Sequence, residues 1–222
     1  CDWSSDVCSS DLDATGGKPG VVHGAIEWSK GRIGGCARFD GSGSYIDMPS
    51  SPALDALNQR DYTLSAWFCP TDIPAGKNSD SNALYSILNR PGMIEGVRFT
   101  FQKTFCFEHV VDGEKEGETK AHSAGAWNLQ CEPGQWYHVA CVVERTKGKS
   151  SIYVNGKLEN SAQWDPKAAP HDYGDLPWRV GAAAPAPSPY GFSAKGRIDD
   201  VRLYKRALDD AAIERLAKEG GS

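Results

Sequence analysis

Hydrophobic and polar residues alternate along most of this chain with a period of two, which is typical of β-strands that bury one face. Between residues 97 and 102, valine and phenylalanine alternate with arginine, threonine and glutamine. The same pattern predicts strands at 33–39, 44–48, 62–69, 84–89, 97–102, 105–111, 126–131, 136–144, 150–155, 177–182 and 196–205. Turns are marked by Asp40-Gly41, Asp112-Gly113 and Asn155-Gly156, and the last pair is a strong signal for a two-residue hairpin.

Helical spacing is confined mainly to the last part of the chain. Apolar residues recur at helical intervals over 209–218, and Asp209 is suited to cap the first turn of that helix. In the strand before it, Asp199 shares a face with Val201 and Leu203. We therefore expect a buried carboxylate at Asp199, which needs hydrogen-bond donors or a cation. The pattern as a whole predicts an all-β protein with one short C-terminal helix.

Composition fits one globular domain and argues against two classes of function. A chain of 222 residues, 40% of them hydrophobic, can bury a real core, and its 24 glycines and 13 prolines suit short strands joined by turns. The net charge of -5 and the lack of a basic run argue against nucleic acid as a partner. Because no apolar run approaches the roughly 20 residues that cross a bilayer, we expect no membrane span.

The cysteines leave one question open. None of the five that follow residue 12 belongs to a C-x-x-C pair, which would indicate a zinc or redox site. Cys36, Cys69 and Cys141 fall in predicted strands, where we interpret them as small buried hydrophobic residues. Cys106 and Cys131 flank a polar insertion on candidate neighbouring strands. They could pair in an oxidising compartment, or remain free thiols.

Six segments occur in an order that a known family shares: IGGCARFDG at 33–41, SYIDMP at 44–49, YTLSAWF at 62–68, QWYHVACVV at 135–143, SIYVNGK at 151–157 and GRIDDVRLYKRAL at 196–208. This set resembles the LamG-like jelly-roll domains of the concanavalin A-like lectin and glucanase superfamily. The resemblance covers roughly residues 13–218 and implies a jelly-roll β-sandwich of two antiparallel sheets. It says less about activity, because this fold hosts lectins, polysaccharide-binding modules, adhesion domains and enzymes.

Residues 1–12 (CDWSSDVCSSDL) fit nothing in that family and have no hydrophobic period. We interpret them as the translation of a sequencing adapter, an artefact of metagenomic assembly, and predict a disordered leader. The domain then spans 13–218, with a tail at 219–222. In this arrangement the family's usual first strand is missing. Because that strand would pair with the closing strand at 197–204, we expect an unpaired edge there.

The sequence gives little support for catalytic groups. A glycoside hydrolase of this fold needs two carboxyl groups about 5 to 9.5 Å apart, and the Glu-x-Asp-x-x-Glu strand motif of such enzymes does not occur. Three glutamates alternate at 114–118, among charged and small residues just after a turn, so we expect a solvated hairpin tip. Tyr137 and His138 lie in a strand that looks largely buried. We assign no catalytic residue and predict that the chain is not an enzyme.

Aromatic residues indicate a carbohydrate-binding surface, because flat rings stack on sugars while polar groups fix the hydroxyls. Trp67 and Trp136, and with them Trp28, are expected in the core. Side chains in or beside long variable segments are the candidates for ligand binding: Trp127, Trp164, His171, Tyr173, Trp178 and Tyr190. The alternative for each of them is packing at the rim of the sandwich, under long loops.

The resemblance also implies a structural Ca²⁺ at the margin of the sandwich, bound by carboxylate and carbonyl oxygens. The matching positions are Asp40, in the Asp40-Gly41 turn, and Asp199 or Asp200 in the closing strand. An Asx-type turn at Asp40, and hydrogen bonds from loop amides to the aspartate pair, are the alternatives.

These observations favour a non-catalytic recognition module that binds polysaccharide or another glycan. By the resemblance, it belongs to a larger protein that is extracellular, periplasmic or on the cell surface. A protein-binding or adhesion module of the same fold is the first alternative. A glycoside hydrolase or polysaccharide lyase is the second.

Overall fold

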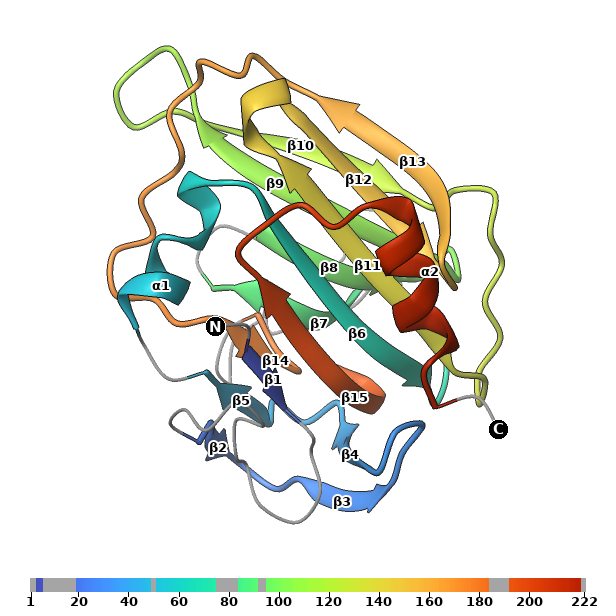
Figure 1. Cartoon of the computed structure of the whole chain (residues 1–222). Helices are drawn as coiled ribbons and strands as arrows, with labels where there is room; N and C mark the ends of the chain where they lie inside the picture. Colours follow the sequence, from blue (N-terminus) through green and yellow to red (C-terminus); the bar gives the residue numbers. More distant parts are fainter. Residues whose placement is uncertain are drawn as a thin grey trace.

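Two antiparallel β-sheets packed face to face form the body of the molecule (Figure 1). The computed structural model describes residues 19–48, 51–74, 84–91, 95–183 and 192–220, together with the backbone of residues 3–5. The two antiparallel sheets and the short C-terminal helix predicted from the sequence are confirmed.

The first sheet has eight described strands, in the order β13-β12-β11-β6-β15-β4-β3, with β1 paired to β15. Their bounds are β1 (Trp3–Ser5), β3 (Glu27–Lys30), β4 (Gly35–Asp40), β6 (Tyr62–Pro70), β11 (Tyr137–Glu144), β12 (Lys149–Val154), β13 (Lys157–Gln163) and β15 (Lys195–Tyr204).

The second sheet has seven described strands, in the order β10-β9-β8-β7-β14-β5-β2. Their bounds are β2 (Val21–His23), β5 (Tyr45–Asp47), β7 (Leu84–Arg90), β8 (Glu95–Thr100), β9 (Phe105–Asp112), β10 (Thr119–Gly125) and β14 (Arg179–Val180).

The hydrophobic core lies between the sheets, because successive residues of a strand turn to opposite faces. Phe68 of β6 meets Phe99 of β8 and Phe105 of β9, with ring centroids 5.6 and 6.3 Å away. The five described cysteines are all buried free thiols. The disulfide that the sequence left open between Cys106 and Cys131 is therefore not formed.

Helix α2 (Asp210–Lys218) covers part of the outer face of the eight-stranded sheet (Figure 1). The predicted cap is confirmed, because the Asp209 carboxylate accepts a hydrogen bond from the Ala212 amide at 2.7 Å. Ile213 of the helix packs in one buried cluster with Val142 of β11 and Tyr204 of β15. The shorter helical elements are α1 (Pro52–Asp55), η1 (Leu57–Gln59) and η2 (Arg145–Lys147).

Several strands differ from the prediction. Besides β1, the strands β2, β3, β10 and β13 were not expected, whereas the strand predicted at 126–131 is wrong, since that segment is a turn followed by irregular chain. Of these four, β2, β3 and β13 contain no fully buried residue, and β10 buries only its last two. Alternation is weak in such strands because neither face is uniformly apolar.

A β-bulge in β15 changes the position expected for Asp199. The register against β6 shifts between Asp199 and Arg202, and Asp200 has a φ of 47°. Ile198, Val201 and Leu203 lie in the core between the sheets, so Asp199, the residue after Ile198, is on the opposite face, where it pairs with Trp67. The prediction that Asp199 shares a face with Val201 and Leu203 is therefore wrong, but the burial of Asp199 is confirmed, at 0% exposed.

The edge beside β15 is occupied in the structure. Residues 3–5 pair antiparallel with β15, and Ser5 lies opposite Val201. The unpaired edge that we expected along this part of the closing strand is thus covered by the backbone of β1, within the segment that we predicted to be a disordered leader.

Of the three tryptophans expected in the core, Trp67 alone is buried. Trp67 is 3% exposed but is absent from the core between the sheets, and it packs against His138 and beneath Arg32. Trp136 is half-buried, and Trp28 is 38% exposed on the edge strand β3. The expectation for Trp136 and Trp28 is therefore wrong.

Candidate functional site

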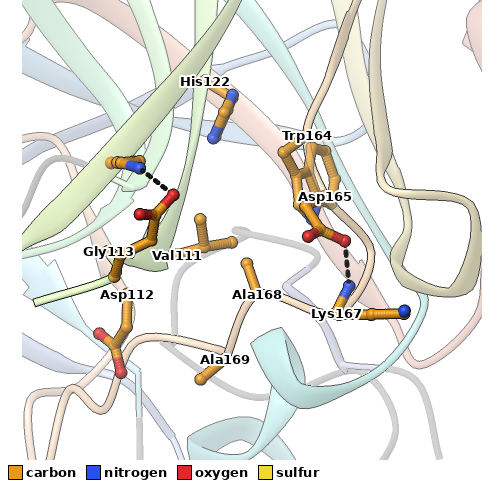
Figure 2. A pocket seen from close by; sticks show the side chains of 11 residues that line it. Val111, Asp112, Gly113, His122, Trp164, Asp165, Lys167, Ala168 and Ala169 are labelled. Atoms are coloured by element: carbon orange, nitrogen blue, oxygen red, sulfur yellow. Dashed lines mark hydrogen bonds and ion pairs between the residues drawn. The ribbon is translucent and has the colours of Figure 1, made fainter.

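A hollow of about 430 Å³ opens at one end of the sandwich, and we call it the rim pocket (Figure 2). It lies between the end of β9 with its following turn, the first half of β10, and the chain that follows β13. Residues 111–114 line one side and five residues of 164–169 line the other, while Lys120 and His122 complete the lining from β10. The volume falls within the range of ordinary small-molecule sites.

Backbone hydrogen bonds hold the two sides of the rim pocket together. The Asp112 amide donates to the Ala169 carbonyl at 2.9 Å, and Val111 forms an isolated bridge with Pro170. The Trp164 amide donates to the Gly148 carbonyl at 2.8 Å. These bonds attach the 164–170 segment to β9 and to the η2 turn, so the pocket is shaped by regular structure rather than by a free loop.

Two rings stand at one end of the rim pocket. Figure 2 shows the side chains of His122 and Trp164 there, with Ala168 and Ala169 farther along the lining. The Trp164 ring is 8% exposed and packs against His109, with ring centroids 4.5 Å apart. Its indole nitrogen is buried without a hydrogen-bond partner among the described residues. Burial, followed by the neighbouring His109, lowers the pKa of the half-buried His122, so this ring is neutral near pH 7.

Charged groups of both signs surround these rings. The carboxylates of Asp112 and Asp165 lie on opposite sides of the pocket in Figure 2, and Glu114 lines it beside Asp112. Asp112 is 2.8 Å from Nδ1 of His171, and Asp165 accepts a hydrogen bond from the Lys167 amide at 2.9 Å. Such carboxylates keep free lone pairs, which can accept hydrogen bonds from the hydroxyl groups of a ligand.

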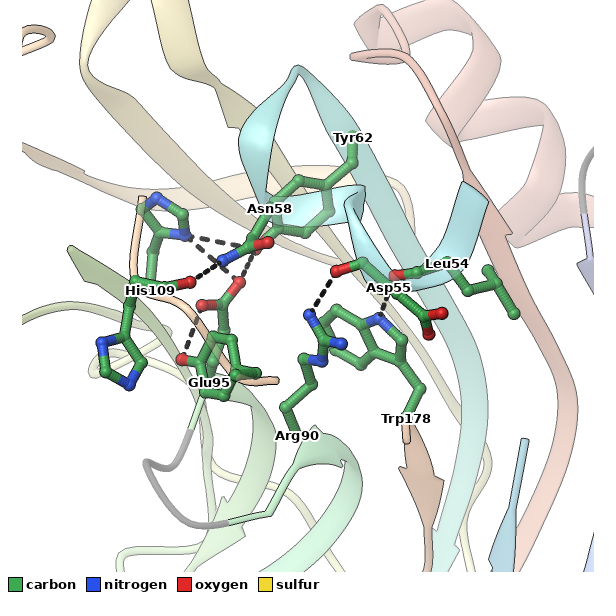
Figure 3. A network of polar contacts seen from close by, with 10 residues as sticks. Leu54, Asp55, Asn58, Tyr62, Arg90, Glu95, His109 and Trp178 are labelled. Atoms are coloured by element: carbon green, nitrogen blue, oxygen red, sulfur yellow. Dashed lines mark hydrogen bonds and ion pairs between the residues drawn. The ribbon is translucent and has the colours of Figure 1, made fainter. Parts of the chain in front are cut away.

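A buried polar network lies beneath the rim pocket and contacts it through the His109–Trp164 ring pair (Figure 3). Glu95 is 0% exposed and accepts hydrogen bonds from the hydroxyls of Tyr62 at 2.5 Å and Tyr173 at 2.8 Å. Nδ1 of His109 is 3.4 Å from the same carboxylate. Burial raises the pKa of Glu95, but the contacts with His109 and the two tyrosines outweigh it and hold the pKa below its ordinary value.

Arg90 extends the network to the segment that follows the rim pocket. It donates to the carbonyls of Asp55 and Leu176, and its guanidinium lies against the rings of Tyr173 and Trp178, at 4.9 and 5.7 Å from their centroids. Figure 3 shows Arg90 beside the Trp178 ring, with its hydrogen bond to Asp55 as a dashed line. Because Arg90 is 1% exposed, its five donors need such partners. The network therefore fixes the chain at 173–178.

The predicted ligand-binding residues do not form one platform. Of those that the structure describes, Trp164 alone lines the rim pocket, and His171 supports it through Asp112. Tyr173 and Trp178 are 5% and 1% exposed, since their polar atoms are used internally, by Glu95 and by the Leu54 carbonyl. Trp127 is 49% exposed in the turn after β10, at the other end of that strand from the pocket. Tyr190 lies outside the described residues.

Sequence reasoning missed His122, Asp112 and Lys120 as pocket residues. The Asp112-Gly113 turn was recognised, and the exposed glutamates at 114–118 confirm its solvated tip. The signal that could have found the others is the returning strand of that hairpin, β10, which pairs with β9 from Thr119 opposite Asp112.

The three residues predicted to bind Ca²⁺ are not brought together. Asp40 accepts hydrogen bonds from the amide and hydroxyl of Ser42, which lower its pKa. Asp40 lies opposite Lys195, so Asp199 is four strand positions away, or about 13 Å along β15. Asp200 pairs with Arg202 at 2.7 Å. In the part of the chain that the structure describes, no three His, Cys, Asp or Glu residues form a metal-binding group. Calcium binding stays a prediction.

Two further observations bear on function. Tyr137 and His138 are buried, at 6% and 1% exposed, which confirms the burial expected of their strand, and burial lowers the pKa of His138 to about 4. Within the described ranges, no helix has the length and apolar character needed to cross a membrane.

Comparisons with known proteins agree with the fold. The family model described as concanavalin A-like lectin/glucanases superfamily matches residues 40–214. Domain 4 of AbnA, a GH43 extracellular arabinanase from Geobacillus stearothermophilus, in complex with arabinotriose, has a TM-score of 0.64 at 21% identity, over 97% of this chain and 96% of that one. No curated protein matches the chain by sequence.

Two other solved structures are larger than this chain. The binding domain of Paraclostridial Mosquitocidal Protein 1 has a TM-score of 0.67 at 14% identity, and the match covers 97% of this chain and 51% of that one. Trypanosoma rangeli sialidase in complex with the inhibitor DANA has a TM-score of 0.59 at 16% identity, covering 100% of this chain and 33% of that one. At these identities, the likeness shows the fold alone.

Proposed function

This chain belongs to the concanavalin A-like lectin/glucanases superfamily, and from that premise we propose that it is a non-catalytic carbohydrate-binding module. Its rim pocket takes a neutral sugar. The module works outside the cytoplasm as part of a larger protein. This location has its support in a similar domain of an extracellular arabinanase.

The observation that carries the proposal is the combination of groups in the rim pocket. Trp164, of which 8% is exposed, borders the pocket with part of its ring, the uncharged His122 adds ring surface, and the indole nitrogen of Trp164 is a buried donor without a partner among the described residues. Asp112, Glu114 and Asp165 offer acceptors for sugar hydroxyls. Because three carboxylates face only two lysines, a neutral ligand suits the pocket better than an anion.

Calorimetric titration with neutral oligosaccharides tests the proposal, beginning with arabinotriose and a panel of neutral disaccharides. We expect saturable binding that Trp164→Ala weakens about tenfold or more, since stacking on one ring contributes about 1 to 3 kcal/mol. Asp165→Asn, which keeps the size of the side chain, should weaken it a few-fold. Trp127→Ala is the matched control, because Trp127 is an exposed tryptophan at the far end of β10.

Other outcomes would overturn the proposal. Unchanged affinity in folded Trp164→Ala and Asp165→Asn variants would move the site away from the rim pocket. Binding to none of the neutral glycans would favour the adhesion alternative, and release of shortened products from a polysaccharide would establish an enzyme. A repeat of the titration in chelator tests the calcium prediction, and we expect unchanged sugar affinity because Asp40, Asp199 and Asp200 do not line the pocket.

A further inference from the structure

A second hollow, of about 390 Å³, lies on the outer face of the eight-stranded sheet, and we call it the sheet hollow. Four of its lining residues form a row across four adjacent strands. Glu27 of β3 lies opposite Arg38 of β4, Arg38 lies opposite Arg197 of β15, and Arg197 lies opposite Cys69 of β6. Paired residues on adjacent strands present their side chains to the same face. The row therefore gathers two arginines and one glutamate.

Within the described ranges, Arg197 has no carboxylate partner of the kind that a half-buried arginine usually has. Its guanidinium lies over the ring of Trp136, 5.0 Å from the centroid, and one terminal nitrogen is 3.2 Å from the sulfur of Cys69. Among the described residues it forms no ion pair with a carboxylate. A thiol is a weak acceptor, and a guanidinium carries five donors in a planar fork that matches a carboxylate. Arg197 is thus held in one orientation with its best acceptor missing.

Arg38 is less constrained. It pairs with Glu27 at 2.8 Å, but the two side chains are 54% and 74% exposed. An ion pair so exposed contributes little, so a ligand can displace it at small cost. The hollow therefore offers one fixed and one movable guanidinium in a chain whose net charge is -5.

The remaining lining is shallow and mixed, because Trp28 and Pro70 add apolar surface. Ser29 and Thr71 add hydroxyl groups at its sides, and Gly134 leaves open space there, because a Cβ on that glycine would meet no atom within 4 Å. Helix α2 covers the outer face near the other end of β15, where it packs with Tyr204. A sugar, which has both hydroxyl groups and an apolar ring face, suits such a mixed lining.

We propose that the sheet hollow is a second ligand site, which binds an acidic sugar through its carboxylate. Arg197 grips the carboxylate with two parallel hydrogen bonds, and Arg38 turns from Glu27 to add a third. The site is independent of the rim pocket, which shares no lining residue with it. The module would then recognise a glycan that carries both neutral and uronic or other carboxylated residues.

Calorimetry with digalacturonic acid and with galactobiose, its neutral counterpart, tests this site. We expect the acid to bind at least tenfold more tightly than the neutral disaccharide. Arg197→Lys keeps the positive charge over Trp136 but loses the fork, and should weaken binding of the acid about tenfold. Arg38→Gln should weaken it two- to fivefold. Trp164→Ala is the control that should leave the affinity for the acid unchanged.

Several results of these titrations would overturn the proposal. Equal affinity for the two disaccharides, or no binding of the acid, would overturn the proposal. So would unchanged affinity in both Arg197→Lys and Arg197→Gln, provided that each variant melts within a few degrees of the parent. Equal binding of an acidic peptide such as triglutamate would overturn the assignment to a sugar. Because galactobiose can also bind the rim pocket, the two disaccharides are compared in the Trp164→Ala variant, so that the failure of one site is distinguished from the failure of the other.

Discussion

Two carboxylates, one beneath the rim pocket and one beside the sheet hollow, are equally buried, but their pKa values are shifted in opposite directions. Glu95 and Asp199 are each 0% exposed. The pKa of Glu95 lies below its ordinary value, whereas that of Asp199 is raised to about 6. Burial acts in the same sense on both carboxylates, so the difference comes from the donors around them.

Three side chains contact Glu95, and together they outweigh the cost of burial. Two tyrosine hydroxyls and His109 share its two oxygens. Asp199 has backbone donors at one oxygen, from the amides of Arg32 at 2.6 Å and Ile33 at 2.9 Å, and its other oxygen is buried without a hydrogen-bond partner in the described chain. The Glu95 carboxylate beneath the rim pocket therefore has its hydrogen-bonding needs met, whereas folding disfavours the charged form of Asp199.

We expect the largest loss of stability from a substitution of Glu95. Glu95→Gln leaves His109 and two tyrosine hydroxyls buried around a neutral amide, and should lower the free energy of unfolding by about 3–5 kcal/mol. Urea unfolding measures it. Glu27→Gln, which removes an exposed ion pair at the sheet hollow, should cost less than about 1 kcal/mol. Similar losses in the two variants would erase the contrast between the regions.

The pH dependence of Asp199 comes next. Because its folded pKa of about 6 exceeds the unfolded value, the folded protein holds a proton that the unfolded chain has released, and stability falls as pH rises from about 4 to about 6. The loss should amount to about 1 to 3 kcal/mol. Asp199→Asn should remove this slope while keeping an acceptor for the two amides. Urea unfolding at several pH values measures both proteins.

Glu95 affects stability in the opposite sense as pH changes, and it provides the control for the Asp199 experiment. Its depressed pKa contributes stability above the unfolded value, which is lost as pH falls through the folded one. The Asp199→Asn protein should therefore still lose stability in acid. A slope between pH 4 and 6 that the variant shares with the parent would place the responsible proton elsewhere.

The smallest effect that we expect is that of ionic strength on ligand affinity. Raising the ionic strength from about 0.02 to about 0.2 M shortens the screening length roughly threefold. We expect the affinity for digalacturonic acid to fall about two- to fivefold, while that for a neutral sugar changes by less than about 1.5-fold. Titration at both salt concentrations measures this. Equal salt dependence for the two ligands would contradict the assignment of one charged and one neutral site.

The fold was predictable from the sequence where burial follows a simple period. β6, β9 and β11 are largely buried and were found within one residue of their ends. β13 was missed because no residue in it is fully buried, although the Asn155-Gly156 turn before it was recognised. The bulge at Asp200 was not predicted. One inserted residue moves every later side chain of the strand to the opposite face, and a period of two in the sequence does not reveal the insertion.

The sites were less predictable than the fold. Composition shows that Tyr173 and Trp178 are large and amphipathic, but not whether their polar atoms bond to solvent or to Glu95 and the Leu54 carbonyl. Trp164 and His122 are 42 residues apart in the sequence and meet through the pairing of β9 with β10 and the packing of the chain after β13. The row of Glu27, Arg38, Arg197 and Cys69 likewise exists through strand order alone.

That strand order also has a consequence during synthesis. β15, the last strand, lies in the middle of its sheet, between β6 and β4 (Figure 1). Until residue 204 has left the ribosome, the two halves of this sheet have no strand to join them, and the edges of β4 and β6 that pair with β15 stay unpaired. The domain must therefore fold after translation of its final strand, and a nascent chain stalled before it would depend on chaperones to avoid aggregation.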